Sequence, residues 1–236
     1  MGKEHTGDRF RGIQIRALKK DEHGAILLMT VLLLAILLLL AGLATDFARL
    51  YVAREELQTA VDAAALAGSR QGVRYVTITV GYGHCETCCG LDGCSCCCVC
   101  DPPVTLTGPE KDLVEKGGWK RGTCCDRFLG YEKRWIEYPS NTTAVASTVL
   151  DINWPRFMSP EYGGGKLSDK IEIYDSGPYS PSVVARAAGM IKTTFLKLAG
   201  IKDVSSSRCS QAGTFYSVIR NGWLLGRNSA PMDACR

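Results

Sequence analysis

The sequence predicts an α+β protein. A single N-terminal transmembrane helix continues into a long Ala-rich helix, and a small extracytoplasmic domain of mixed α/β structure with a Cys-rich insert follows. Three observations predict this arrangement. The segment from Ala25 to Ala44 carries no charge, strong helix formers without proline follow it to Ala67, and beyond Gly68 short β-like runs alternate with Gly and Pro.

Residues 1–23 are polar and of mixed charge, as in a short cytoplasmic tail. The uncharged run from Ala25 to Ala44 would span about 30 Å as a helix, which is the thickness of the hydrocarbon core. A cleaved signal peptide is the alternative, but its apolar region is usually shorter and a small-x-small pattern should follow it directly. We therefore expect an uncleaved anchor.

Flanking positive charge predicts the orientation of this anchor, since Lys and Arg beside the first span resist translocation. Basic residues are concentrated before the run, at Lys3, Arg9, Arg11, Arg16, Lys19 and Lys20, whereas Arg49 and Arg54 follow it. We expect a single-pass protein of the cytoplasmic membrane with a cytoplasmic N-terminus and an extracytoplasmic C-terminal domain. The net charge of +4 is too small and dispersed for nucleic-acid binding.

Nothing in the sequence forces a break after the span, so one continuous helix is expected from about Ala25 to Ala67. Along its second half, six residues recur at spacings of three and four and form a narrow stripe: Leu50, Ala53, Leu57, Ala60, Ala64 and Ala67. Small side chains allow a neighbouring backbone to come close. The stripe either packs on the chain's own domain or forms an intermolecular seam.

The region 69–236 is expected to form the extracytoplasmic domain, with the Cys-rich insert at about 84–125. Strands are predicted at Val73–Val80 and Thr142–Ile152, with Lys170–Tyr174 a weaker candidate. A helix is predicted at Pro181–Gly200 from its apolar spacing, its early proline and its final glycine. Residues 158–169 contain three consecutive glycines and are expected to be a loop.

The helix expected at 24–68 carries a distinctive motif, which consists of Arg54, Leu57, Gln58, Ala60, Asp62, Ala63, Ala64, Ala65, Leu66 and Ala67. With this motif, the region resembles the N-terminal module of the TadE/TadG-like proteins of Flp (tight-adherence) pilus systems, which consists of a transmembrane helix and a helical module. The family's processing site has Gly followed by Glu at the fifth position, whereas Met29 stands there after Gly24. The resemblance therefore implies a permanently anchored TadG-like component and not a processed pseudopilin.

This resemblance implies a membrane-anchored structural or accessory component of Flp (Tad-type) pilus assembly in the bacterial envelope, with a role in cell adhesion and surface attachment. Its partners would be the membrane and other Tad pilus-assembly proteins. No catalytic residues are expected, because the sequence lacks the common catalytic and nucleotide-binding motifs and His84 is the one histidine beyond the span. We therefore expect a protein that is not an enzyme.

The segment HCETCCGLDGCSCCCVC, residues 84–100, allows three uses of its cysteines. Disulfides are the default outside the cytoplasm, and the total of 12 cysteines is even. A zinc or iron site at Cys85, Cys88, Cys97 and Cys100 is the second possibility, and redox-active thiols are the third. We expect disulfides in a Gly-containing loop and no cofactor, with a membrane-tethered metal-binding or thiol redox protein using the Cys85–Cys125 cluster as the alternative function.

Overall fold

The computed structural model describes the backbone of residues 22–90, 93–175, 181–214, 217–220, 223–227 and 232–235, and the side chains of these ranges apart from 22–23 and 217–233. The basic residues that predicted the orientation lie before residue 22 and thus outside the described residues. The chain divides into two compact units, Met1–Val52 with Lys192–Val204 and Ala53–Ile191 with Ser205–Arg236.

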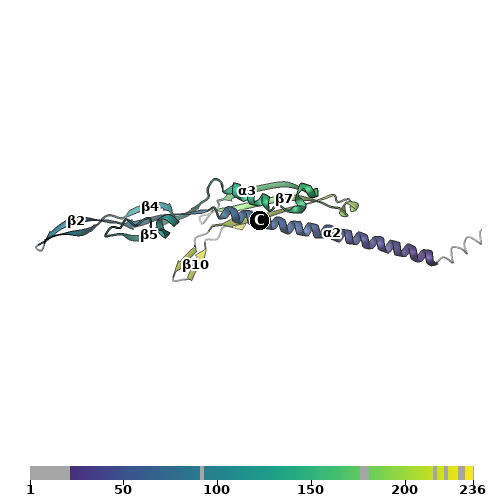
Figure 1. Cartoon of the computed structure of the whole chain (residues 1–236), viewed down its shortest axis with the longest axis horizontal. Coiled ribbons are helices and arrows are strands. Elements are labelled where there is room, and N and C mark those ends of the chain that lie inside the picture. Colours follow the sequence, from purple (N-terminus) through teal and green to yellow (C-terminus); the bar gives the residue numbers. More distant parts are fainter. Residues whose placement is uncertain are drawn as a thin grey trace, which may run out of the picture. The chain divides into compact units, whose positions relative to one another are not determined.

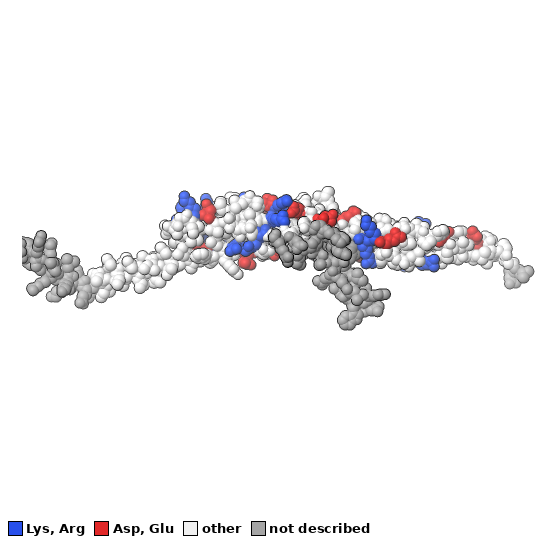
Figure 2. Space-filling view, turned by 180° about the vertical axis from the view of Figure 1, so that it is seen from behind, with Lys and Arg blue, Asp and Glu red and all other residues white. Residues whose placement is uncertain are grey.

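Helix α2, Glu22–Ser69, is continuous and confirms the predicted single helix. Among the described residues it is the one helix long and apolar enough to cross a membrane. Its large apolar side chains from Ile26 to Leu40 are 48–68% exposed, and Figure 2 shows this part of the helix as a surface without charge. Exposed apolar side chains are unfavourable in water, whereas the hydrocarbon core of a bilayer would solvate them favourably.

In the first unit, the connection between strands β7, Ser182–Lys192, and β8, Asp203–Gly213, forms a closed loop. The Thr193 N–H donates to the Lys202 carbonyl at 3.0 Å, and the short 3-10 helix η4, Leu196–Ala199, lies between these two residues. Gly200 ends η4 with φ 87°, a left-handed conformation that glycine adopts without strain. The Ile201 N–H then donates to the Leu196 carbonyl at 3.1 Å, which ties the exit of the loop to its start.

In the second unit, an antiparallel sheet has the strand order β4-β1-β5, formed by Val104–Pro109, Val73–Gly81 and Arg127–Glu137. Its core consists of the alternate residues Val76, Ile78, Val80 and Tyr82. The π-helix η1, Lys111–Glu115, packs Leu113 and Val114 on that face. Strand β1 matches the predicted strand at Val73–Val80 and buries one face, as its alternating pattern indicates.

A second sheet has the order β6-β7-β8, formed by Gly165–Tyr174, Ser182–Lys192 and Asp203–Gly213. Helix α3, Thr142–Ile152, and strand β7 lie beside the second half of α2 (Figure 1). A Cβ atom added to Gly68 would lie 2.7 Å from Val183 Cγ1 and 3.2 Å from Ala146 Cβ. Glycine therefore permits the close approach of α2 to both elements. The weaker strand prediction at Lys170–Tyr174 is confirmed, because these residues are part of β6.

Two predictions of secondary structure were wrong. Thr142–Ile152 is helix α3 and not a strand, because Thr142, Ala146 and Leu150 are buried at helical spacing despite its many β-branched residues. The predicted helix at 181–200 is strand β7 followed by η4. Strand β7 is the central strand; its first residues, Ser182–Ala185, are buried on both faces, and no residue before Lys192 is exposed, so its apolar run resembles a helix segment.

The remaining elements are short. The expected loop at 158–169 begins at the last residue of the 3-10 helix η2, Arg156–Met158. It contains the 3-10 helix η3, Pro160–Tyr162, and the first residues of β6. Strands β9 and β10 pair antiparallel at Ser217–Arg220 and Trp223–Arg227, and the 3-10 helix η5 spans Met232–Cys235. The fold is thus one long apolar helix followed by a β-rich domain.

Candidate functional site

Asp46 holds the β7–β8 connection against α2. It lies two residues beyond the uncharged run and is only 2% exposed. Both of its carboxylate oxygens accept the Thr194 N–H at 3.1 Å, and Oδ2 also accepts the N–H groups of Phe195 at 2.7 Å and Leu196 at 2.8 Å. One turn further along α2, Arg49 Nη1 donates to the Thr194 hydroxyl at 3.3 Å. A buried carboxylate is tolerated here because backbone donors replace its water.

The ionisation of Asp46 follows from these contacts. Burial raises the pKa of its carboxyl group, but the N–H donors of Leu196, Thr194 and Phe195, together with the positive charge of Arg49, lower it by more. The net effect holds the pKa below its ordinary value of 3.8. Asp46 is therefore ionised at neutral pH, and its negative charge stabilises the turn that begins at Thr194.

The family-motif residues on α2 separate onto two faces of the helix. Leu57, Ala60, Ala64 and Ala65 are fully buried, together with Ala53 and Val61. Val61 lies on the same face but outside the stripe predicted from the sequence, while Leu50 and Ala67 at the two ends of that stripe are half-buried. The chain's own second unit therefore covers the centre of the stripe, as in the first of the two alternatives.

The opposite face of α2 carries the polar part of the motif. Arg54, Asp62 and Leu66 are exposed, and Gln58 and Ala63 are half-buried. Gln58 Nε2 donates to Asp62 Oδ1 at 2.9 Å, one helical turn away. Surface pairs at this spacing contribute only about 0.2–0.5 kcal/mol to a helix. The fold thus gains little from these two residues, and their side chains are available on the surface.

The Cys-rich segment is a β-hairpin and not the expected loop. Strands β2, Gly83–Gly90, and β3, Gly93–Cys100, pair antiparallel and extend beyond the β4-β1-β5 sheet (Figure 1). Within these two strands only Gly83 is buried, so the hairpin adds no apolar side chain to the core. An isolated two-stranded hairpin is marginally stable at best in water. The hairpin therefore needs covalent cross-links to stabilise it in place of a hydrophobic core.

All 12 cysteines pair as disulfides, which confirms this use of the cluster. Because side chains alternate along a strand, the register places Cys88 and Cys97 on one face of the hairpin and its other cysteines on the opposite face. Three disulfides each join cysteines on the same face and close the hairpin: Cys85–Cys96, Cys89–Cys94 and Cys88–Cys97. Two more, Cys98–Cys124 and Cys100–Cys125, connect the hairpin to the segment before β5. The sixth, Cys209–Cys235, joins β8 to η5.

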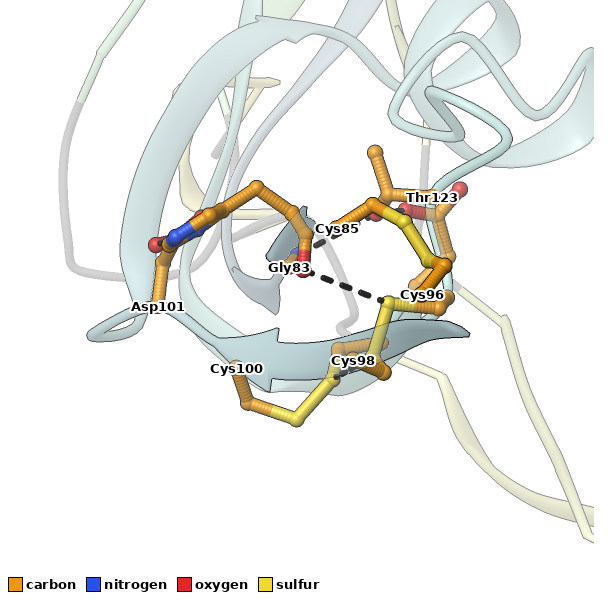
Figure 3. The surroundings of a disulfide bond; sticks show 11 residues. Gly83, Cys85, Cys96, Cys98, Cys100, Asp101 and Thr123 are labelled. Atoms are coloured by element: carbon orange, nitrogen blue, oxygen red, sulfur yellow. Dashed lines mark hydrogen bonds and ion pairs between the residues drawn. A yellow bond between two sulfur atoms is a disulfide. The ribbon is translucent and has the colours of Figure 1, made fainter. Parts of the chain in front are cut away.

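A tight turn presents Cys124 and Cys125 to the base of the hairpin. Asp126 accepts the N–H groups of Arg121 at 2.8 Å and Gly122 at 2.6 Å, and it also accepts the Thr123 hydroxyl. Thr123 in turn accepts the Gly83 N–H at 3.2 Å, as Figure 3 shows beside the Cys98 and Cys100 disulfides. The Thr123 hydroxyl, with the two backbone donors, lowers the pKa of Asp126. This turn fixes the position of both cysteines.

The residues proposed as metal ligands are all placed in disulfides. Cys85 pairs with Cys96, Cys88 with Cys97, and Cys100 with Cys125. The Sγ atoms of Cys98, Cys124 and Cys125 do lie within 4.8 Å of one another, but each of the three is also disulfide-bonded. A disulfide sulfur lacks the thiolate charge that binds zinc or iron.

His84, which begins the Cys-rich segment, contacts two carboxylates. Its Nδ1 lies 2.9 Å from Asp101 Oδ1, and its Nε2 lies 3.2 Å from Glu86 Oε1. The hydrogen bond with Glu86 and then that with Asp101 raise the pKa of His84. All three side chains are more than two-fifths exposed, so these surface ion pairs add little stability.

The comparisons with known proteins concern the helix. Residues 24–71 match the model of the putative Flp pilus-assembly TadE/G-like family. The matched segment coincides with α2 from the start of its apolar run to the turn before β1. No curated protein and no solved structure matches the chain.

Proposed function

We propose that this chain is a membrane-anchored structural or accessory component of Flp (Tad-type) pilus assembly that acts in adhesion and surface attachment. The observation that carries the proposal is the family match at residues 24–71, because it covers a single helix with an apolar half and a packed half. The apolar half suits an anchor, and the second half holds the β-rich domain.

The proposed topology places the N-terminus in the cytoplasm and the domain outside it. The excess of basic residues before the apolar run supports this orientation. The pairing of all 12 cysteines gives independent support, since disulfides persist in oxidising compartments and are rare in the cytosol. The disulfide-linked hairpin would then be a rigid, protease-resistant projection of the extracytoplasmic domain.

We further propose that Gln58 and Asp62 contact another pilus-assembly protein. These residues belong to the motif, yet their hydrogen bond lies on the exposed face of α2 and contributes little to the fold. A role as a protein contact fits their exposure better than a role in packing. The role that we propose is structural, without a catalytic step and without a cofactor.

The test is complementation of a strain that lacks the gene, with piliation and surface attachment as readouts. The wild-type chain should restore both. A variant with Gln58→Ala and Asp62→Ala should restore neither, while its amount in the membrane stays normal. The matched control is Glu55→Ala with Thr59→Ala, which changes neighbouring exposed positions outside the motif. Normal fibres and attachment in the deletion strain would contradict the proposed function.

A further inference from the structure

The β7–β8 connection contacts α2 within the uncharged run that forms the proposed membrane anchor. Gly42 is part of the uncharged run of α2, and it is buried beneath the Phe195 ring so closely that an added Cβ atom would overlap the ring. At about 1.5 Å per residue, Gly42 lies only about 3 Å inside the end of the run at Ala44. A bilayer that covers the run through Ala44 must therefore also reach Phe195.

The side chains that this connection exposes are apolar at its tip. Leu198 is 77% exposed, Ile201 is 45% exposed and Phe195 is 37% exposed. In water each of these side chains would be unfavourably solvated. Exposed apolar residues scattered singly need no explanation, but these three lie within seven positions of a loop that touches the membrane-spanning run.

Basic side chains accompany the apolar ones. Lys197 and Lys202 are exposed and lie next to Leu198 and Ile201 in the sequence. Lys192 at the end of β7 and Asp203 at the start of β8 are also exposed, and their opposite charges cancel. Apolar side chains next to lysines are the composition of segments that lie in the headgroup region of a bilayer, where the lysine stems extend toward anionic phosphates.

The loop is held in place from both sides. The contacts of Thr193 with Lys202 close its ends, and the Asp46 carboxylate fixes Thr194, Phe195 and Leu196 onto α2. Because the same helix carries the anchor, the loop keeps a constant depth relative to the apolar run. Little conformational freedom remains to be lost when it meets lipid.

We propose that residues 193–202 form a second membrane contact, in which Phe195, Leu198 and Ile201 enter the headgroup boundary of the bilayer that α2 crosses, while Lys197 and Lys202 meet anionic headgroups. The proposal rests on the proposed anchor. It commits to lipid as the occupant, because the loop surface is continuous with the apolar surface of α2 at Gly42.

The test uses the full chain in vesicles of phosphatidylcholine with or without phosphatidylglycerol. A p-benzoylphenylalanine residue replaces Leu198, and mass spectrometry detects covalent lipid adducts after illumination. Leu33, 60% exposed within the apolar run, is the positive control for the anchor. Ile152, at the end of α3 in the second unit, is the matched control because it is 77% exposed, the same as Leu198.

We expect lipid adducts at Leu33 and Leu198, several-fold above those at Ile152, with a further increase at Leu198 when phosphatidylglycerol is present. The double change Lys197→Gln and Lys202→Gln should remove that increase and leave the adducts in phosphatidylcholine. Adducts at Leu33 but not at Leu198 would overturn the second contact alone, whereas their absence at both positions would contradict the anchor itself. Adducts of Leu198 with protein instead of lipid would overturn the proposal in favour of a chain-to-chain contact.

Discussion

The Asp46 carboxylate accepts the backbone N–H of Leu196 at 2.8 Å, although 150 residues separate the two in the sequence. This contact joins the end of the apolar run of α2 to the connection between two strands of the β-rich domain. It is buried and charge-assisted, and such hydrogen bonds contribute about 1.5–3 kcal/mol. The position of the 193–202 loop on α2 therefore depends on one carboxylate.

Replacing Asp46 with alanine should release this loop. The N–H groups of Thr194, Phe195 and Leu196 lose their acceptor, which should lower the local free energy of opening by about 1.5–3 kcal/mol. Asp46→Asn keeps one acceptor oxygen and should have a smaller effect. Hydrogen exchange of these three amides in the full chain measures the change. Asp62→Ala, on the exposed face of α2, is the control, and unchanged exchange in Asp46→Ala would contradict the role given to the carboxylate.

The same contact predicts a dependence on pH. Because the pKa of Asp46 is lower in the folded chain than its ordinary value of 3.8, the unfolded chain binds the proton first as the pH falls. The contribution of Asp46 to stability is complete above that value and is lost as the pH drops through the lower, folded value. The difference in amide protection between wild type and Asp46→Asn should thus shrink below about pH 4. A difference that persists at still lower pH would exclude this mechanism.

Gly42 should tolerate no side chain while Phe195 stays in place. An added Cβ atom overlaps the Phe195 ring, so Gly42→Ala should displace the loop at a cost of about 1–3 kcal/mol, typical of overpacking. The higher helix propensity of alanine opposes this by about 1 kcal/mol. In the double variant with Phe195→Ala the overlap is gone, so protection of the Leu196 amide should recover. Equal loss in the single and double variants would contradict the overlap with the Phe195 ring as the cause of the effect.

The sequence predicts features that local patterns determine. An uncharged, proline-free stretch can only be a long helix, and the alternation in Val73–Gly81 reflects one buried face, so α2 and β1 were found. Strand β7 was missed because its start, Ser182–Ala185, is buried on both faces and shows no alternation, and α3 was missed because its β-branched content outweighed its helical spacing. The contact of Asp46 with Leu196 was not predicted, since nothing local in the sequence connects the two residues. The pairing of 12 cysteines likewise needs the register of the hairpin.

The two disulfides at the base of the hairpin should stabilise the chain as a pair. Cys98–Cys124 and Cys100–Cys125 have sequence separations of 26 and 25 and close nearly the same loop. Removing one by Cys→Ser changes of both partners should cost much less than removing both, which should cost about 3 kcal/mol. Denaturant unfolding of the full chain measures this, and peptide mapping establishes the pairing. Equal and additive losses would contradict the idea that the two bonds constrain the same loop.

Substitutions at a buried and at an exposed position of α2 distinguish a role in packing from a role in partner binding. Ala60 is fully buried within the chain, so Ala60→Leu must push apart the surfaces around it and should cost about 1–3 kcal/mol of stability. Asp62 is exposed two residues away, so Asp62→Asn should leave the melting temperature unchanged. Thermal melting of the full chain in detergent measures both variants, with surface attachment of complemented cells as the second readout.

Attachment should fall in the Ala60→Leu strain only in proportion to the loss of folded protein in the membrane. In the Asp62→Asn strain, any loss of attachment must occur at a normal amount of folded protein, because the changed side chain faces solvent and lies outside the core. A normal melting temperature together with lost attachment in Ala60→Leu would instead mean that Ala60 contacts another chain. That outcome would require the helix to separate from its own domain during assembly, since in the structure no surface of Ala60 is exposed.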